Sequence, residues 1–233
     1  MKNILIIGGT KGIGKALATQ LASKHHVFSA QRNLPADPIE GVQYITFDAT
    51  TGAIDLTQLP DVIHGFVYAP GSINLRPFKG LKQEAFIQDM QLNFFGMIPI
   101  IQAILPRLQA TDKSSIVLFS TVAVGLGMPF HSSIAAAKGA VEGFARALAA
   151  ELAPVVRVNV IAPSLTLTPL ADKFLNTPEK TEKAAERHPL KSVGKAEDIA
   201  AMAAYLLEDQ SQWISGQVFH IDGGMSRLQM MHG

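Results

Sequence analysis

A short apolar run at the start of the chain leads directly into a glycine-rich turn. The run is Asn3–Ile7, the turn is Gly8-Gly9-Thr10-Lys11-Gly12-Ile13-Gly14, and a helical pattern follows at residues 13–24. Glycines between a strand and a helix permit a tight turn, and they let the backbone approach a pyrophosphate at the helix N-terminus. This first strand–helix junction therefore predicts nucleotide binding.

Further apolar runs rich in β-branched residues alternate with longer helical patterns. Predicted strands are Asn3–Ile7, Val27–Ala30, Gln43–Phe47, Gly65–Ala69, Ser115–Ser120, Val156–Ile161 and Gln217–Ile221, and helical patterns cover 13–24, 82–110, 133–152 and 196–208. Hydrophobicity within the runs is continuous, which is typical of strands covered on both faces. The pattern predicts an α/β chain with a doubly wound Rossmann fold, in which helices cover both faces of a single seven-stranded parallel sheet.

No repeat or linker marks a second domain, so residues 1–233 are predicted to form one domain. The most polar stretch, at about residues 170–195, contains Pro178 and Pro189 and interrupts the alternation just after a strand end. Open α/β sheets bind ligands at that edge, so this stretch is predicted to be a mobile flap over the site. The alternative is a solvated helical excursion with no role.

Composition excludes several classes of function. The 20 Lys and Arg balance 19 Asp and Glu without a charged run, which argues against nucleic-acid and polybasic membrane contacts. No apolar run reaches the roughly 18 residues of a membrane helix, and the N-terminal run is too short for a signal peptide. Cysteine is absent and the seven histidines lack metal-ligand spacing. These features predict a cytoplasmic protein without a metal site.

The spacing Gly8-x-x-x-Gly12-x-Gly14 resembles that of the short-chain dehydrogenase/reductase family, and the resemblance extends over the whole chain. Further matching segments follow in the family's order: Asp48, Asn93 within Leu92–Gly96, Lys138 in an Ala-rich helix, Asn159–Ser164, Pro189-Leu190, Gly194, Glu197–Ala200, Gly216-Gln217 and Asp222–Gly224. The resemblance implies a dinucleotide-dependent oxidoreductase that acts on a small-molecule substrate. It also implies a homodimer or homotetramer, because the family commonly pairs the Ala-rich helix across a subunit interface.

The resemblance also implies which residues bind the dinucleotide. Asp48 would contact adenine, and Lys138 would contact the nicotinamide ribose. The full predicted set is Gly8, Thr10, Lys11, Gly12, Ile13, Gly14, Arg32, Asp48, Ala49, Ala69, Gly71, Lys138, Pro163 and Thr168.

Charge after the second predicted strand indicates which dinucleotide is preferred. The segment Ala30-Gln31-Arg32-Asn33 offers an arginine and no carboxylate. A carboxylate there would bond the ribose 2′-hydroxyl of NAD and repel a 2′-phosphate, whereas an arginine does the reverse. Lys11 adds a second cation, so NADP(H) is predicted over NAD(H).

The catalytic motif departs from the family's pattern. Family members carry Tyr-x-x-x-Lys, in which the lysine lowers the pKa of the tyrosine so that the phenol exchanges a proton with the substrate. The tyrosine position here holds Ile134, which cannot transfer a proton. The family's carbonyl-polarising serine aligns with Thr121, beside Ser120; neighbours on a strand point to opposite faces, so one of the two is expected in the site. Asn93 matches the family's helix-kinking asparagine.

Two other side chains are candidates to replace the tyrosine. His131 lies seven residues before Lys138, about two helical turns, and resembles the tyrosine spacing of some enoyl reductases in the family. The alternative is a loop histidine with no catalytic role. Ser132 and Ser133 are typical helix-capping residues, so the helix would begin after His131. Tyr68, at the end of the fourth predicted strand, is interpreted as a packing aromatic.

Three functions remain open from the sequence. The leading one is an NADP(H)-dependent oxidoreductase that transfers hydride to a carbonyl or activated double bond, with Thr121, Lys138, Asn93 and His131 in the catalytic site and a non-standard proton donor. The second is a catalytically silent NADPH-binding sensor or assembly protein, favoured by Ile134. The third is non-redox chemistry, such as dehydration, with a structural nucleotide.

Overall fold

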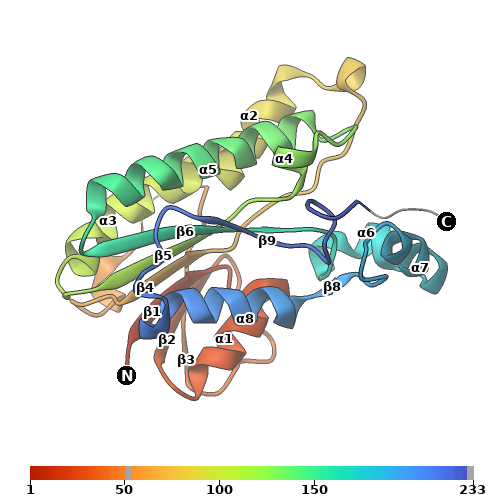
Figure 1. The fold of residues 1–233 in the computed structure, drawn as a ribbon. Helices are drawn as coiled ribbons and strands as arrows, with labels where there is room; N and C mark the ends of the chain where they lie inside the picture. Colours follow the sequence, from red (N-terminus) through yellow and green to blue (C-terminus); the bar gives the residue numbers. More distant parts are fainter. Residues whose placement is uncertain (51–53, 230–233) are drawn as a thin grey trace.

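A computed structural model describes residues 1–50 and 54–229. Seven parallel strands form one sheet in the order β3-β2-β1-β4-β5-β6-β9, with helices on both faces (Figure 1). The strands are β1 Asn3–Ile7, β2 His26–Gln31, β3 Val42–Thr46, β4 Gly65–Tyr68, β5 Ser114–Phe119, β6 Val156–Pro163 and β9 Val218–Ile221. The doubly wound, seven-stranded parallel sheet is confirmed, and each predicted strand lies within two residues of its observed bounds.

Helices cover the two faces of the sheet in separate layers (Figure 1). One layer contains α1 (Gly12–Ala22) and α8 (Ala196–Leu207), and the other contains α2 (Gln83–Asn93), α3 (Ile98–Leu108) and α5 (Ser132–Leu152). Alternate residues of β1 serve the two layers: Ile4 and Ile6 join the core beneath α1 and α8, while Leu5 and Ile7 join the core beneath α3 and α5. Burial on both faces explains the continuous hydrophobicity of the strand.

The predicted helical pattern over 82–110 divides into two helices. The chain forms α2, a 3-10 turn at Phe95–Met97, and then α3. The Asn93 amide donates to the backbone oxygen of Asp89 and to Ser72 Oγ, each at 2.8 Å, and Phe94 then leaves helical geometry with φ −130°. The break therefore follows Asn93, where the family resemblance places a kink.

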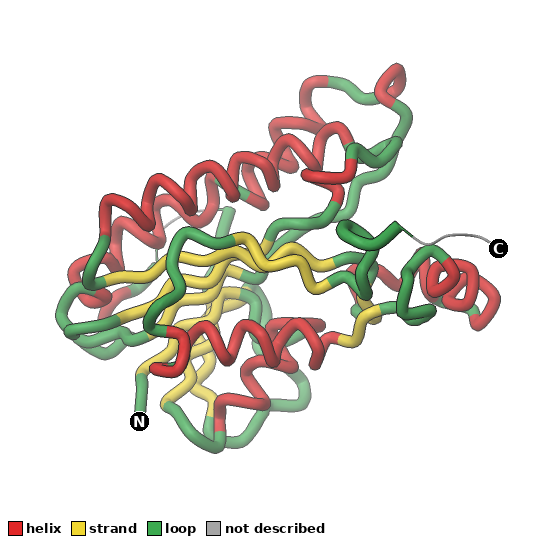
Figure 2. Tube along the Cα trace, viewed as in Figure 1, coloured by secondary structure: helices red, strands yellow, loops and turns green. Residues whose placement is uncertain are grey.

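Residues 170–195, the flap, extend beyond the end of the sheet as short helices and loops (Figure 2). Just before and within it lie β7 (Thr166–Leu167), a 3-10 turn at Pro169–Ala171, α6 (Asp172–Leu175), α7 (Pro178–Glu186) and β8 (Gly194–Lys195). β7 and β8 pair in parallel, a small second sheet that the sequence did not predict. A separate cluster of buried apolar side chains holds the flap together: Ala171, Leu175, Ala184 and Val193.

The remaining elements are α4 (Ala123–Leu126) and 3-10 turns at Leu56–Gln58, Phe78–Gly80 and Asp209–Ser211. None of the described helices has the length and apolar character needed to cross a membrane.

Candidate functional site

The glycine turn between β1 and α1 adopts a conformation that larger residues would disrupt. Gly8 and Gly12 have φ of +85° and +51°, in the left-handed region. A Cβ on Gly14 would overlap the carbonyl oxygen of Gly8, so the first turn of α1 lies directly against the preceding loop. The residue before α1, Lys11, makes no side-chain capping bond within the described chain. The first amides of α1 are thus available to a phosphate, which fits a dinucleotide.

The predicted adenosine side lies at the carboxyl ends of β2 and β3, which are neighbours in the sheet. Arg32 directly follows β2 and is exposed, as is Lys11 in the glycine turn. Hydrogen bonds from the backbone and side chain of Thr50, followed by the charge of Arg32, hold the pKa of Asp48 below its usual range. Arg32 and Asp48 are therefore close in space. Ala49, which follows Asp48 in the sequence, is buried. The local charge at the end of β2 is cationic, with an ionised carboxylate near it.

A cavity of about 240 Å³ lies at the carboxyl ends of β4, β5 and β6. It collects the predicted residues Ile13, Ala69, Gly71, Thr121, His131, Lys138, Pro163 and Thr168. Most of its remaining wall is apolar, including Ile73, Leu75, Met128 and Phe174. Thr168 also connects the cavity to the glycine turn, because a Cβ on Gly12 would lie 3.2 Å from its Cβ.

Lys138 brings a buried ammonium group to this cavity. Its side chain is 7% exposed, and Nζ donates to the carbonyl oxygen of Phe119 at 2.9 Å. Burial lowers the pKa of Lys138 to about 8, and the negative charge of Asp89 opposes that shift. A Cβ on Gly71 would lie 3.7 Å from Nζ, so the loop after β4 passes close to the amine.

Asp89, which no sequence pattern singles out, organises the polar groups behind the cavity. Its carboxylate is 1% exposed and accepts from Ser72 Oγ at 2.6 Å, from Asn74 Nδ2 at 2.8 Å and from Ser133 Oγ. Asn93 lies one turn later on α2 and contacts the same Ser72 hydroxyl. Asn93 thus lies behind the cavity and supports its wall through Ser72, which is a lining residue.

The position of the missing tyrosine lies in the cavity wall. Ile134 is 4% exposed, is one helical turn before Lys138 on α5, and lines the cavity with it. Thr121 and Ser120 both border the cavity, but their hydroxyl groups differ. Ser120 Oγ donates to Glu142 Oε1 on α5 at 2.6 Å, whereas Thr121 Oγ1 accepts from the backbone of Ala123 at 3.3 Å and keeps its proton available.

His131 directly precedes α5 and borders the cavity. Its Nδ1 lies 2.7 Å from the carbonyl oxygen of Pro129. A carbonyl oxygen can only accept, so Nδ1 carries a proton and the neutral ring presents Nε2 as an acceptor. The ring can deliver a proton from Nε2 only as an imidazolium. The neighbouring Ser133, predicted as a capping residue, instead donates to Asp89.

Tyr68 occupies a packing position, in agreement with the interpretation from the sequence. Its side chain is buried at the end of β4, and its hydroxyl donates to the backbone oxygen of Leu92 at 2.8 Å. Burial raises the pKa of Tyr68 well above its usual value. A phenol held in this way is a poor proton donor for the cavity.

A serine–histidine pair that the sequence does not predict borders the same cavity. Ser164 Oγ lies 2.8 Å from His188 Nε2, and His188 Nδ1 lies 2.9 Å from the carbonyl oxygen of Ala184. The two residues are 24 positions apart, one after β6 and one in the flap. The only sequence signal is a histidine directly before the matched Pro189-Leu190 segment.

Comparisons with known proteins identify the family. Residues 50–226 match the family model described as enoyl-(acyl carrier protein) reductase. A tropinone reductase homolog of Arabidopsis thaliana is 31% identical, with 96% of this chain and 92% of that protein covered. The 3-oxoacyl-[acyl-carrier-protein] reductase FabG of Thermotoga maritima is also 31% identical, with 96% and 97% covered.

Solved structures agree on the fold. The ligand-free aldohexose dehydrogenase of Thermoplasma acidophilum superposes with a TM-score of 0.91 at 22% identity, over 100% of this chain and 96% of that one. The glycine turn, the lysine of α5 and these whole-length similarities lead to one conclusion. The chain belongs to the short-chain dehydrogenase/reductase family of NAD(P)-dependent oxidoreductases.

Proposed function

We propose that this protein is an NADP(H)-dependent oxidoreductase that reduces a carbonyl or an activated carbon–carbon double bond of a small, largely apolar molecule, using a proton donor other than tyrosine. The observation that carries the proposal is the position of Lys138, buried in the wall of the cavity that also contains Thr121 and adjoins the glycine turn. Burial of the Lys138 ammonium group costs desolvation free energy, which an apolar side chain at this position would avoid.

The chain offers a group for each part of the dinucleotide. The first amides of α1 would hold the pyrophosphate, and Lys138 the nicotinamide ribose. Arg32 and Lys11 would hold a 2′-phosphate, since charged nitrogen donors bind phosphate oxygens strongly and no carboxylate follows β2 directly. NADPH, when bound, supplies a hydride to the substrate.

The residues of the cavity polarise the substrate, exclude water and supply the proton. The Thr121 hydroxyl donates to the substrate oxygen and polarises it, which stabilises negative charge that develops there. The apolar side chains around it exclude water and favour apolar substrates. Reduction of an activated double bond suits a site without tyrosine, because the resulting enolate can take its proton from His131, as an imidazolium, or from water.

A second candidate function is an NADPH-responsive sensor or assembly protein. The buried position of Ile134 favours it, because an apolar side chain there removes the acid without leaving a hole. The two functions differ in whether bound NADPH is ever oxidised.

We also propose a cytoplasmic homodimer or homotetramer. Small residues line the exposed side of α5 at Ala136, Gly143 and Ala147, which allows close approach of a second helix. Light scattering after size exclusion tests the assembly, and Gly143→Arg is expected to reduce the mass of the particle.

The test of the proposed function is NADPH oxidation, followed by absorbance, over a panel of ketones, quinones and enones. NADPH fluorescence in the same cuvette reports binding. Turnover of an apolar enone or ketone is the expected result. Tight NADPH binding without oxidation of any compound would favour the sensor.

A further inference from the structure

Ser164 and His188 form a hydrogen-bonded pair in a region that is otherwise mainly apolar. His188, within the flap, is 2% exposed, and its ring nitrogens lie 2.8 Å from Ser164 Oγ and 2.9 Å from the oxygen of Ala184. A buried imidazole with both nitrogens bonded is held in one orientation. The reaction steps described above do not use this pair.

The contact with Ala184 determines the protonation pattern of the ring. The carbonyl oxygen can only accept, so Nδ1 of His188 carries a proton. In the neutral ring, Nε2 therefore has a free lone pair and accepts the Ser164 hydroxyl proton. This is the arrangement of a serine whose proton can move to an adjacent base.

Ser164 has a second acceptor within reach. Its Oγ lies 3.2 Å from Met225 Sδ, a weak acceptor. When His188 is an imidazolium, Nε2–H donates to Ser164 Oγ and the serine proton must point elsewhere, to the thioether or to a substrate. The hydroxyl can thus reverse the direction of its hydrogen bond without being left unpaired.

The backbone brings this pair next to the proposed substrate-polarising group. The amide of Val122 donates to the carbonyl oxygen of Pro163 at 3.2 Å, which ties the residue after Thr121 to the residue before Ser164. Ser164, His188, Thr121 and Lys138 all line the one cavity. A substrate oxygen that reaches Thr121 therefore lies in the same cavity as the serine hydroxyl.

We propose that Ser164 and His188 form the proton relay that replaces the missing tyrosine, with Ser164 touching the substrate and His188 acting through it. The proposal rests on the proposed function. In carbonyl reduction, bound NADPH would supply the hydride that adds to the carbonyl carbon. As the C=O π pair moves to oxygen, Ser164 transfers its proton to that oxygen. The Nε2 proton of His188 moves to Ser164 Oγ, leaving a neutral imidazole that regains a proton from water. Oxidation of an alcohol by NADP⁺ runs through the same atoms in reverse.

The test compares His188→Gln, Ser164→Ala and Ser164→Thr with the unaltered protein, using NADPH and the fastest ketone from the panel. His26→Gln is the matched control, because His26 is exposed at the start of β2. We expect kcat to fall about a hundredfold in His188→Gln and Ser164→Ala, the usual contribution of a general acid. NADPH affinity is expected to stay within about twofold, and Ser164→Thr to keep most of kcat, since it retains the hydroxyl that the relay uses.

A spectroscopic measurement tests the pair without turnover. Long-range ¹H–¹⁵N spectra of the protein with NADP⁺ are expected to show neutral His188 protonated at Nδ1, and Ser164→Ala is expected to shift its Nε2 resonance. An Nε2–H tautomer would overturn the relay.

The kinetic outcomes separate the two proposals. If the unaltered protein oxidises NADPH but His188→Gln keeps its kcat, the relay is wrong and the proposed function stands. The relay is also wrong if His188→Gln loses NADPH binding and folding together, because His188 would then only hold the flap in place. It is wrong as well if His131→Gln alone abolishes turnover. If the unaltered protein oxidises no NADPH with any compound, both proposals fail.

Discussion

Ile134 lies one turn before Lys138 on α5, and both side chains line the cavity at the carboxyl ends of β4, β5 and β6. The lysine of the family's Tyr–Lys pair is thus present in the cavity wall, whereas an apolar side chain occupies the tyrosine position. Lys138 is retained at a cost, because burial lowers its pKa to about 8. The proposed function requires this combination: a site that binds a nucleotide through Lys138 and moves protons by groups other than tyrosine.

Ile134→Tyr is expected to raise the rate of ketone reduction. The new phenol would lie on the cavity face of α5 beside Lys138, whose charge favours the phenolate and so makes the hydroxyl a better acid. We expect a gain of about tenfold or more in kcat, within the range for an added general acid. Ile134→Phe is the control, since it adds the ring without the hydroxyl. Equal rates in the two variants would contradict this role of the position.

Lys138→Met is expected to weaken NADPH binding and to stabilise the protein without nucleotide. The methionine avoids the desolvation of a buried ammonium, so the free energy of unfolding at pH 7 should rise by about 1–2 kcal/mol, less what is lost with the bond to Phe119. NADPH affinity should fall about tenfold. Denaturant unfolding and fluorescence titration measure the two effects, with Lys113→Met as the exposed control. A destabilised variant would show that the ammonium is structural.

The pH dependence of NADPH binding follows from the same lysine. The ammonium form exists below its folded pKa of about 8 and is lost above it, so affinity is expected to fall as pH rises through that value. Calorimetry in buffers of different ionisation enthalpy should detect proton uptake on binding near pH 8. Lys138→Met should abolish that uptake; its persistence would assign the proton to another group.

The stability of the nucleotide-free protein should change with pH in the opposite direction. The unfolded chain keeps the Lys138 proton up to the ordinary lysine pKa of 10.5, whereas the folded chain releases it near pH 8. Because the unfolded state binds more protons between these values, the contribution of Lys138 to the free energy of unfolding rises with pH across that window. Denaturant unfolding of the unaltered protein and of Lys138→Met at pH 7 and pH 9.5 measures the difference. A gap between the two proteins that does not narrow at the higher pH would contradict the lowered pKa.

Arg32→Glu is expected to shift the preference from NADPH to NADH. Replacing a cation by a carboxylate removes charged hydrogen bonds to a 2′-phosphate and adds repulsion, so the Kd for NADPH should rise about tenfold to hundredfold. The Kd for NADH should stay the same or fall. Fluorescence titration with each nucleotide measures both constants.

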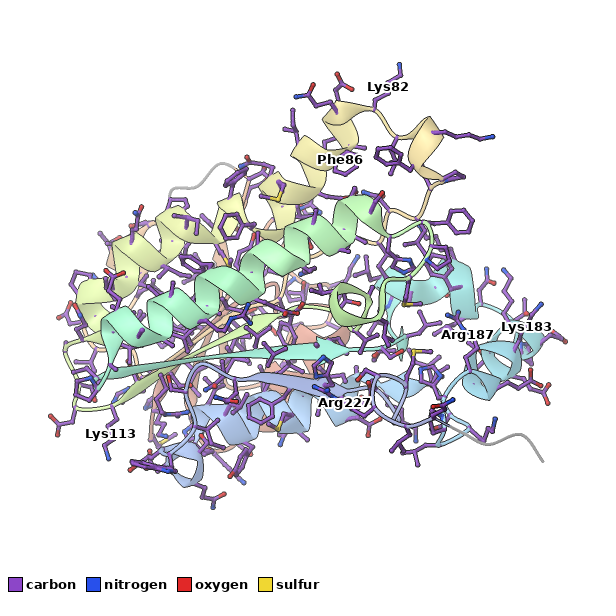
Figure 3. The ribbon with its side chains drawn as sticks, turned by 45° about the horizontal axis from the view of Figure 1, so that its top comes forward. Lys82, Phe86, Lys113, Lys183, Arg187 and Arg227 are labelled. Carbon is purple, nitrogen blue, oxygen red and sulfur yellow. The ribbon has the colours of Figure 1, made fainter. Side chains whose placement is uncertain are left out.

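Lys113→Glu is the control for Arg32→Glu, because it makes the same change in net charge at a site away from Arg32. Lys113 directly precedes β5, so it lies at the amino-terminal edge of the parallel sheet, whereas Arg32 follows the carboxyl end of β2. Figure 3 shows Lys113 at the other end of the molecule from Arg187 and Lys183 of the flap. Its effect on NADPH binding measures the contribution of net charge alone. A loss equal to that of Arg32→Glu would show that Arg32 makes no local contact.

Local sequence pattern was enough to predict several parts of the molecule. The first apolar run matches the bounds of β1 to the residue, and the glycine spacing located the turn where Gly12 takes a positive φ. The family motif located the helix break at Asn93, because its cause is a side chain bonding to the preceding turn.

The remaining features depend on contacts between distant segments. Ser164 meets His188 only because the flap returns along the end of β6, a path that no periodicity encodes. In the sequence, Asp89 resembles an ordinary residue of an amphipathic helix, and its three hydrogen-bond donors come from the loop after β4 and the start of α5. The pairing of β7 with β8 spans two residues on each side, which is too short to leave a strand pattern.

The most direct test of hydride transfer by this protein uses NADPH carrying deuterium at the transferable position of its nicotinamide ring. The protein is incubated with the labelled nucleotide and the ketone and enone panel, and products are examined by mass spectrometry. We expect a reduced product that carries one deuterium at carbon, with loss of the label from the nucleotide. Labelled NADPH that binds tightly and keeps its deuterium with every compound would contradict hydride transfer and favour a protein that only senses the nucleotide.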